Sequence, residues 1–118
     1  MAQNGVRDLE IWRSGMDLVE AVYRLTRELP REERFALGDQ LRRAAVSVPS
    51  NIAEGWARNA AADFRRFVLI AAGSCAETQT QLLICERVGL MTREQTRPAL
   101  VLTDRLGRML HAFAASLR

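Results

Sequence analysis

The stretch at residues 40–55, QLRRAAVSVPSNIAEG, carries two lines of side chains that repeat every three or four residues, the spacing of an α-helix. The first line is apolar and begins one turn earlier; its members are Leu37, Leu41, Ala44, Val48 and Ile52. An amphipathic helix buries such a line against its neighbours. The sequence therefore predicts a helix over residues 33–56, with acidic residues in its first turn, where they suit the positive end of the helix dipole.

Pro49 lies in the middle of this predicted helix. A proline removes one backbone N–H donor, and we expect it to bend the helix. The side chains of Ser50 and Asn51 are placed to satisfy the backbone groups that the proline frees. Two shorter helices, broken at residues 47–49, are the alternative arrangement.

The second line is polar and runs beside the apolar face; its members are Gln40, Arg43, Ser47, Asn51, Glu54 and Arg58. A later segment carries a matching line of Ser74, Glu77 and Gln81. A solvated flank is one interpretation, but single charges between amides and hydroxyls favour a structural polar seam that fixes the register of two helices. In such a seam Arg43 or Arg58 can pair with Glu77. Asn51 can form a hydrogen bond across to the next helix.

The helical period recurs along the rest of the chain and predicts helices over residues 8–28, 61–88 and 93–117. Pro30 ends the first helix, Gly89 caps the third, and Thr92 with Gln95 is a capping box for the last. The predicted core lines are Phe64, Phe67, Ala71, Ser74, Thr78, Leu82 and Cys85 in the third helix, and Leu102, Leu106, Met109, Phe113 and Leu117 in the fourth. We predict an all-α, up-down-up-down four-helix bundle in which residues 1–118 form a single domain.

The first predicted helix has two apolar stripes, whereas a surface helix needs only one. The stripes are Leu9, Trp12, Met16, Val19 and Tyr23 on one side, and Ile11, Leu18, Val22 and Leu25 on the other. Because one bundle covers one stripe well, we expect the other stripe to lie between the subunits of a homo-oligomer. Either Leu18 and Val22 or their counterparts Trp12 and Met16 would form that interface.

The composition fits one globular domain, with 118 residues, of which 48% are hydrophobic and 26% are charged. Residues 1–7 lack the apolar run of a signal peptide, and the longest uncharged stretches are half as long as the ~20 residues of a membrane span. We expect a cytoplasmic protein with no membrane partner. Cys75 and Cys85 lie ~15 Å apart on one predicted helix, too far for a disulfide, and we expect both as small buried hydrophobes.

The inventory of catalytic side chains is thin. His111 is the only histidine, and neither a cysteine nor a carboxylate stands beside it at a spacing that suits a metal ligand. The sequence has no Glu-x-x-His pair, no phosphate-binding Gly-rich loop and no Gly-x-Ser-x-Gly elbow. We expect a protein that is not an enzyme and that has neither a cofactor nor a metal.

Residues 40–55 resemble the signature of the four-helix-bundle proteins encoded in bacterial 23S rRNA intervening sequences. Further matches are Asp8-Leu9-Glu10-Ile11-Trp12, Tyr23-Arg24-Leu25-Thr26, Pro30-Arg31-Glu32-Glu33, Asp63-Phe64-Arg65-Arg66-Phe67, Ala72-Gly73-Ser74, Glu77 and Gln81-Leu82. The resemblance spans residues 8–90. Thr78 departs from it, because the family tends to carry an apolar residue there.

The resemblance implies a small bundle that assembles into a ring-like homopentamer, and a ribosomal-protein-like or RNA-associated role. Accessory proteins of diversity-generating retroelements share this fold and bind a reverse transcriptase and nucleic acid through basic surfaces. Two functions therefore follow as expectations: association with RNA or another nucleic acid, or a protein-interaction scaffold such as an accessory subunit of a reverse transcriptase.

Basic charge is concentrated in two parts of the chain, which has a formal net charge of +3 and in which all 17 basic residues are Arg. Residues 40–66 hold five Arg and two acidic residues, and residues 87–118 hold six Arg and two acidic residues. We predict that Arg42, Arg58, Arg65 and Arg66 gather near one loop and bind nucleic acid, with Arg105 and Arg108, beside Arg93 and Arg97 on the last helix, extending the patch. Scattered solvated arginines are the alternative. Trp56 is the one aromatic side chain at the loop that could stack on a base.

Overall fold

Four long helices form from the four periodic segments. The computed structural model describes residues 5–117, which contain α1 (Glu10–Arg27), α3 (Leu37–Ala57), α4 (Ala61–Arg87) and α5 (Arg93–Ser116). A 3-10 turn, η1 (Gly5–Asp8), precedes α1, and a single-turn helix, α2 (Arg31–Arg34), precedes α3. Residues 5–117 contain no strand, so the predicted all-α class is confirmed.

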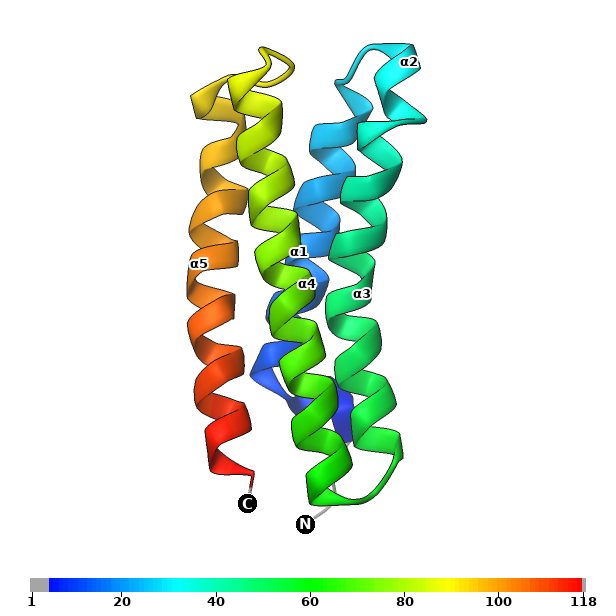
Figure 1. Cartoon of the computed structure of the whole chain (residues 1–118), viewed down its shortest axis with the longest axis vertical. Helices are drawn as coiled ribbons and strands as arrows, with labels where there is room; N and C mark the ends of the chain where they lie inside the picture. Colours follow the sequence, from blue (N-terminus) through cyan, green and yellow to red (C-terminus); the bar gives the residue numbers. More distant parts are fainter. Residues whose placement is uncertain (1–4, 118) are drawn as a thin grey trace.

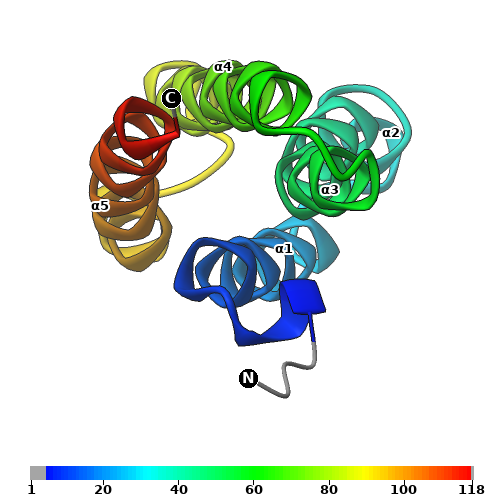
Figure 2. The ribbon, with the colours of Figure 1, turned by 90° about the horizontal axis from the view of Figure 1, so that it is seen from below.

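The long helices run alternately up and down beside one another (Figure 1). Seen from below, α1, α3, α4 and α5 follow one another around a central core (Figure 2), and each long helix packs against its two neighbours in that order. The bundle measures 46 × 21 × 20 Å. This is the up-down-up-down arrangement that three short connections favour.

The apolar line of residues 40–55 lies in the core, as predicted. Leu41, Val48 and Ile52 are completely buried, and Ala44 is nearly so. The line in α4 is buried from Phe64 to Cys85, except for Ser74, which is half-buried. The helical period alone therefore identifies the faces that α3 and α4 turn inward.

Pro49 does not break α3, which continues from Leu37 to Ala57. The proline is buried against α1, where a Cβ atom on Gly15 would lie only 3.4 Å from its ring. Nearby, the amide Nδ2 of Asn51 donates a hydrogen bond to the carbonyl oxygen of Ser47 at 2.8 Å. The alternative of two shorter helices is not adopted.

The predicted start of the second helix is wrong. Residues 31–34 form the separate turn α2, and α3 begins only at Leu37. Two bonds fold the chain here: Arg34 donates from Nε to the carbonyl oxygen of Leu29 at 3.0 Å, and the backbone N–H of Ala36 donates to the carbonyl oxygen of Glu33. These local bonds compete with a continuous helix and leave Phe35 exposed.

The predicted seam of α5 is only partly right. Leu106 is fully buried, but Leu102, Met109, Phe113 and Leu117 are half-buried. The most buried apolar residues of α5 are instead Ala99, Leu106, Leu110 and Ala114. Because α5 packs against both α4 and α1, its inner face is wider than one line, with leucines near its middle and alanines toward its two ends.

The helix ends follow the predicted chemistry. Gly89 has a φ of +80° just after α4, a conformation that glycine adopts without strain. Thr92 and Gln95 form a reciprocal capping box: Gln95 N–H donates to the hydroxyl of Thr92, whose own N–H donates to Oε1 of Gln95. Both predictions are confirmed.

Helix α4 is long and apolar enough to cross a membrane by length and composition alone. It packs along its length between α3 and α5, however, and ten of its 27 residues are buried there. It is therefore the core helix of a bundle. Cys75 and Cys85 on this helix are buried free thiols, as predicted.

Candidate functional surfaces

The centre of the predicted polar seam joins α3 to α4. The hydroxyls of Ser47 and Ser74 lie 2.8 Å apart, and Asn51 Nδ2 donates to both the hydroxyl and the carbonyl oxygen of Ser47, each at 2.8 Å. Thr78, on the next turn of α4, donates its hydroxyl to the carbonyl oxygen of Ser74 at 2.8 Å. These half-buried and buried groups form a satisfied network that holds the two helices in register.

The outer part of the predicted seam does not form. Gln40, Arg43, Glu54 and Glu77 are exposed. Neither predicted pair with Glu77 is present: Arg58 pairs with Glu54 of its own helix at 3.3 Å, and Arg43 takes part in no ion pair within residues 5–117. Asn51 reaches α4 only through the hydroxyl of Ser47. The seam is therefore a short central contact rather than a line along both helices.

Gln81 is the one buried member of the outer seam, at 7% exposure. Its Nε2 donates to Oε2 of Glu77 at 3.3 Å, while its Oε1 is buried without a partner among the described residues. Gln81 therefore bonds within α4 and does not extend the central contact between α3 and α4.

A basic cluster forms where α3 turns into α4. The guanidinium carbons of Arg58 and Arg66 lie 5.0 and 4.6 Å from the ring centroid of Phe67, so two cations from two helices cover one ring. Gly55 permits this approach, because a Cβ atom there would lie 2.6 Å from the Cβ atom of Phe67. Arg65 is also exposed at this end.

The charges of this cluster are only partly compensated. Arg58 pairs with Glu54 at 3.3 Å, and Arg66 lies 3.9 Å from Asp63; all four side chains are at least 43% exposed. Arg65 has no such partner within residues 5–117. The basic end is therefore solvent-facing and available to an anion.

Trp56 lies beside the basic end, as predicted, and is 41% exposed. Its ring packs edge-to-face against Phe64 at 5.8 Å, and Phe64 packs against Phe113 of α5 at 5.4 Å. This aromatic chain anchors the lower end of three helices. It leaves part of one indole exposed.

Arg42 does not belong to this cluster, and its predicted place is wrong. It lies 16 residues before Arg58 on α3, ~24 Å away along the helix axis. Its guanidinium pairs with Asp39, donates to the carbonyl oxygen of Arg34 at 2.6 Å and lies 5.9 Å from the ring of Tyr23. Arg42 is a structural brace of the turn between α2 and α3.

Arg105 and Arg108 are exposed on α5, ~17 and ~12 Å from its end at Ser116. Arg108 pairs with Asp104 at 2.6 Å. Since α4 and α5 run in opposite directions, the two arginines stand above the basic end. They lie along α5 outside the basic cluster at the α3–α4 connection, and their part in one binding patch stays a prediction.

One of the two expected subunit contacts on α1 is wrong. Leu18 and Val22 are completely buried in the core of the single chain, so they cannot reach another subunit. Their counterparts lie on the outer side: Met16 is 43% exposed, and Trp12 is half-buried. The outer stripe on α1 consists of Trp12, Met16, Val19 and Tyr23.

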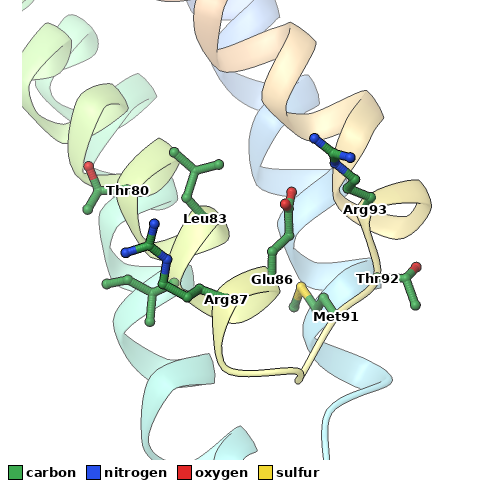
Figure 3. Close-up of a pocket in the computed structure, with 8 residues that line it drawn as sticks. Thr80, Leu83, Glu86, Arg87, Met91, Thr92 and Arg93 are labelled. Carbon is green, nitrogen blue, oxygen red and sulfur yellow. The ribbon is translucent and has the colours of Figure 1, made fainter.

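A groove between α4 and α5 was not predicted from the sequence. It runs along the upper half of these helices. Figure 3 shows its upper part, with Glu86 of α4 on the side of Arg93 of α5 and Arg87 extending to the other side of α4. The sequence does contain an indication of this surface. Leu83 and Ile84 are apolar but lie outside the predicted core line through Leu82 and Cys85, so they are apolar residues that the predicted core does not bury.

Residues 5–117 contain no group of three or more His, Cys, Asp or Glu side chains placed to hold a metal ion. His111 is exposed on α5. Burial raises the pKa of the Cys75 thiol to about 11, and the thiol donates to the carbonyl oxygen of Thr103 at 3.3 Å. Burial and nearby Glu33 raise the pKa of Cys85. A raised pKa lowers the fraction of the reactive thiolate at both cysteines.

A model of the 23S rRNA-intervening sequence protein family matches residues 7–112. No curated protein matches the chain. Among solved structures, a protein of unknown function from the S23 ribosomal protein family of Bacteroides thetaiotaomicron has the same fold, with a TM-score of 0.81 and 23% sequence identity over 88% of this chain and 97% of that one. Because the family match covers nearly all of the described residues, the chain belongs to the 23S rRNA-intervening sequence protein family.

Proposed function

We propose that the protein is a cytoplasmic, non-enzymatic homo-oligomer that associates with RNA through the basic end of the bundle. The observation that carries this proposal is the cluster of Arg58, Arg65 and Arg66 at the connection between α3 and α4. Arg58 and Arg66 are held in place by Phe67, and Arg65 is exposed without an ion pair within the described residues. Guanidinium groups fixed in this way suit phosphate oxygens.

The contacts would be to the RNA backbone, not to the bases. Phosphate contacts position a nucleic acid but do not read its sequence. The cluster offers one partly exposed indole, Trp56, whereas single-strand readers stack several bases on aromatic rings. Binding would therefore be largely independent of sequence and would weaken steeply with salt as counterions are released.

Self-association, with a ring of five copies as the proposed form, would repeat this basic end. The support on the molecule is the outer stripe on α1, which leaves Met16 and Tyr23 more than 40% exposed. Apolar side chains in a continuous row on a helix mark a contact surface. A multimer would convert a weak patch into a multivalent one.

The test compares charge reversals at the two ends of the bundle. Arg65→Glu with Arg66→Glu should weaken binding of a single-stranded RNA at least tenfold, measured by fluorescence anisotropy at low salt. Arg31→Glu with Arg87→Glu makes the same change in net charge at the opposite end, where both residues are exposed, and should have a smaller effect. Light scattering checks that both variants keep the size of the wild type. Equal losses, or no RNA binding by the wild type at low salt, would contradict the proposal.

A second candidate function is that of an accessory subunit for another protein, such as a reverse transcriptase. The observation that favours it is the groove between α4 and α5, which exposes aliphatic side chains at the end opposite the basic cluster. A nucleic acid does not need aliphatic contacts, whereas a protein partner does.

A further inference from the structure

His111 is the only histidine of the chain, and it is exposed on α5. It forms no hydrogen bond and no ion pair within residues 5–117. Neither the core of the bundle nor the basic cluster at the connection between α3 and α4 uses it. A histidine that the fold leaves unused is available to a ligand, and the groups around it indicate which ligand that is.

Two contacts fix the height of His111 in the bundle. The ring centroids of Phe64 and Phe113 lie 5.4 Å apart, and the thiol of Cys75 donates to the carbonyl oxygen of Thr103 at 3.3 Å. Because α4 and α5 are antiparallel, each step toward the start of α4 corresponds to one step toward the end of α5. His111, two residues before Phe113, therefore lies beside the second turn of α4, at the lower end of the bundle (Figure 1).

The helical period fixes the side on which His111 lies. Leu83 of α4 and Leu100 and Asp104 of α5 line one side of the contact between these two helices. Arg65 precedes Leu83 by 18 residues, about five full turns, and His111 follows Asp104 by seven residues, about two turns. Arg65 and His111 therefore lie on that same side of the contact, at nearly the same height.

Gly107 leaves the surface above His111 open. It lies about one turn before His111 on α5, and a Cβ atom there would meet no atom within 4 Å. The residue of α4 about two turns below Leu83 on the same side is Ala76, which is exposed and also short. A ligand can approach the backbone closely where long side chains are absent. The surface above His111 therefore admits an extended ligand.

The charged groups that face His111 come from α4 and α5. Arg65 is exposed and takes part in no ion pair within the described residues. Arg108, about one turn above His111, pairs with Asp104 at 2.6 Å, and both of these side chains are at least 62% exposed. Glu10 of α1, the other long helix packed against α5, lies on the far side of α5, in the groove between α1 and α5. His111 thus has two arginines and one already paired carboxylate around it.

The lower half of the bundle carries a small positive charge without His111. On α3 from Ser47, on α4 up to Cys75 and on α5 from Thr103, the arginines outnumber the carboxylates. They are Arg58, Arg65, Arg66, Arg105 and Arg108, against Glu54, Asp63 and Asp104. The charged residues of η1 and of the first four residues of α1 cancel one another. Five arginines against three carboxylates give this half a net charge of +2, which becomes +3 when His111 gains a proton.

We infer that His111 is a phosphate contact of the proposed RNA site, and that RNA binds more tightly as this histidine gains a proton. A protonated histidine donates from both ring nitrogens, and such charged donors form strong hydrogen bonds to phosphate oxygens. The strand would leave the basic cluster at Arg65, pass His111 and continue over Gly107 beside Arg108. The inference rests on the proposed RNA binding and adds its regulation by pH.

The direction of the pH effect follows from the charge of the histidine. Histidine is the side-chain type that ordinarily changes its charge between about pH 5 and 8. Its cation adds a phosphate contact and releases counterions from the RNA, whereas its neutral form does not. The affinity for RNA should therefore rise as the pH falls through this range, and bound RNA should in turn favour the protonated histidine.

The experiment measures the binding of a labelled oligouridine to the full-length protein by fluorescence anisotropy at low salt. The phosphates and uracils of this probe keep their charge over the pH range used. Wild type should bind at least about threefold more tightly at about pH 6 than at about pH 7.5. The slope of log affinity against log salt should also be steeper at the lower pH, by about 0.7, the value for one more phosphate contact with a single strand.

Three variants test whether His111 causes the effect. His111→Gln should bind with the same affinity at both pH values, and His111→Arg should bind at both as tightly as wild type does at the lower pH. Thr80→His in the His111→Gln background is the matched control, because it returns a single histidine to an exposed position in the upper half of α4. It should not restore the pH response. The terminal α-amino group, which titrates near the same range, is common to all variants.

The outcomes separate this inference from the proposed function. If wild type binds no oligouridine at either pH, the proposed RNA binding and this inference fall together. Equal binding at both pH values, or a pH response that persists in His111→Gln, overturns the inference and leaves the RNA function in place. Light scattering checks the assembly. A size that changes with pH in wild type but not in His111→Gln would mean that His111 acts between subunits, which also overturns the inference.

Discussion

Helix α4 has two faces that meet their surroundings differently. Its face toward α3 is closed: Ser74 bonds to Ser47, and Phe67 lies against Gly55 with no room for another atom. Its outer face is open: Leu83 and Ile84 are exposed, and Gly73 has no neighbour within 4 Å of a Cβ position. Gly55 of α3 is required on the closed face because a side chain there would collide with Phe67, whereas no contact within the described chain requires a glycine at position 73 on the open face. The atoms that a Cβ would meet thus distinguish a glycine needed for helix packing from a glycine on the surface.

The largest test of this comparison uses two adjacent leucines. Leu82 is completely buried and Leu83 is 49% exposed. Leu82→Ala should lower the free energy of unfolding by about 2–5 kcal/mol, because it leaves a cavity, whereas Leu83→Ala should change it by less than about 1 kcal/mol. Urea denaturation measures both. Similar losses at the two positions would mean that Leu83 is part of the core.

The next test adds one methyl group to the closed face. Gly55→Ala places a Cβ atom 2.6 Å from that of Phe67, so α3 and α4 must move apart. We expect a loss of about 1–3 kcal/mol in the free energy of unfolding. Ala57→Gly on the exposed last turn of α3 is a control for helix propensity. An unchanged urea midpoint for Gly55→Ala would contradict the close contact.

A third test separates the centre of the polar seam from its edge. Asn51→Leu removes two hydrogen bonds to Ser47 and should destabilise the protein by about 1–2 kcal/mol. Glu54→Leu removes only an exposed ion pair with Arg58, so we expect a change within about 0.5 kcal/mol. Thermal melting compares the two variants. A larger loss of stability for Glu54→Leu than for Asn51→Leu would mean that the polar seam extends to Glu54, as the sequence predicts.

The smallest effect is expected on the open face, and it has the opposite sign. Gly73→Ala should raise the free energy of unfolding by about 0.5–1 kcal/mol, because alanine restricts the unfolded chain and favours helix at a position with free space. Calorimetry at fixed protein concentration measures the gain. A loss of stability would show that a second molecule or another part of the chain already contacts Gly73.

The sequence predicts the core of this bundle well where one helix has one apolar line. Leu41, Val48 and Ile52 are buried as expected, and the capping residues Thr92 and Gln95 act through chemistry that spans only one turn. Such features depend on local spacing alone.

Two features could not be predicted, because they depend on contacts that spacing does not contain. The two stripes on α1 are equally apolar, and only the packed bundle shows that Leu18 is inside and Met16 outside. The groove requires α5 to lie beside α4 in a particular register. The prediction that Arg42 lies near Arg58 is wrong for a different reason: 16 residues of helix separate the two by ~24 Å, so the helical rise alone is enough to exclude it.

The buried thiol of Cys75 is a chemical probe of how often α4 and α5 separate. Only a thiolate reacts with an alkylating reagent, and the raised pKa of about 11 lowers the thiolate fraction near neutral pH about a hundredfold relative to an ordinary value of 9.0. Because Cys75 also donates its hydrogen bond to the backbone of α5, a reagent reaches it only after α5 lifts from α4. The rate at which Cys75 is labelled therefore reports how readily α5 separates from α4.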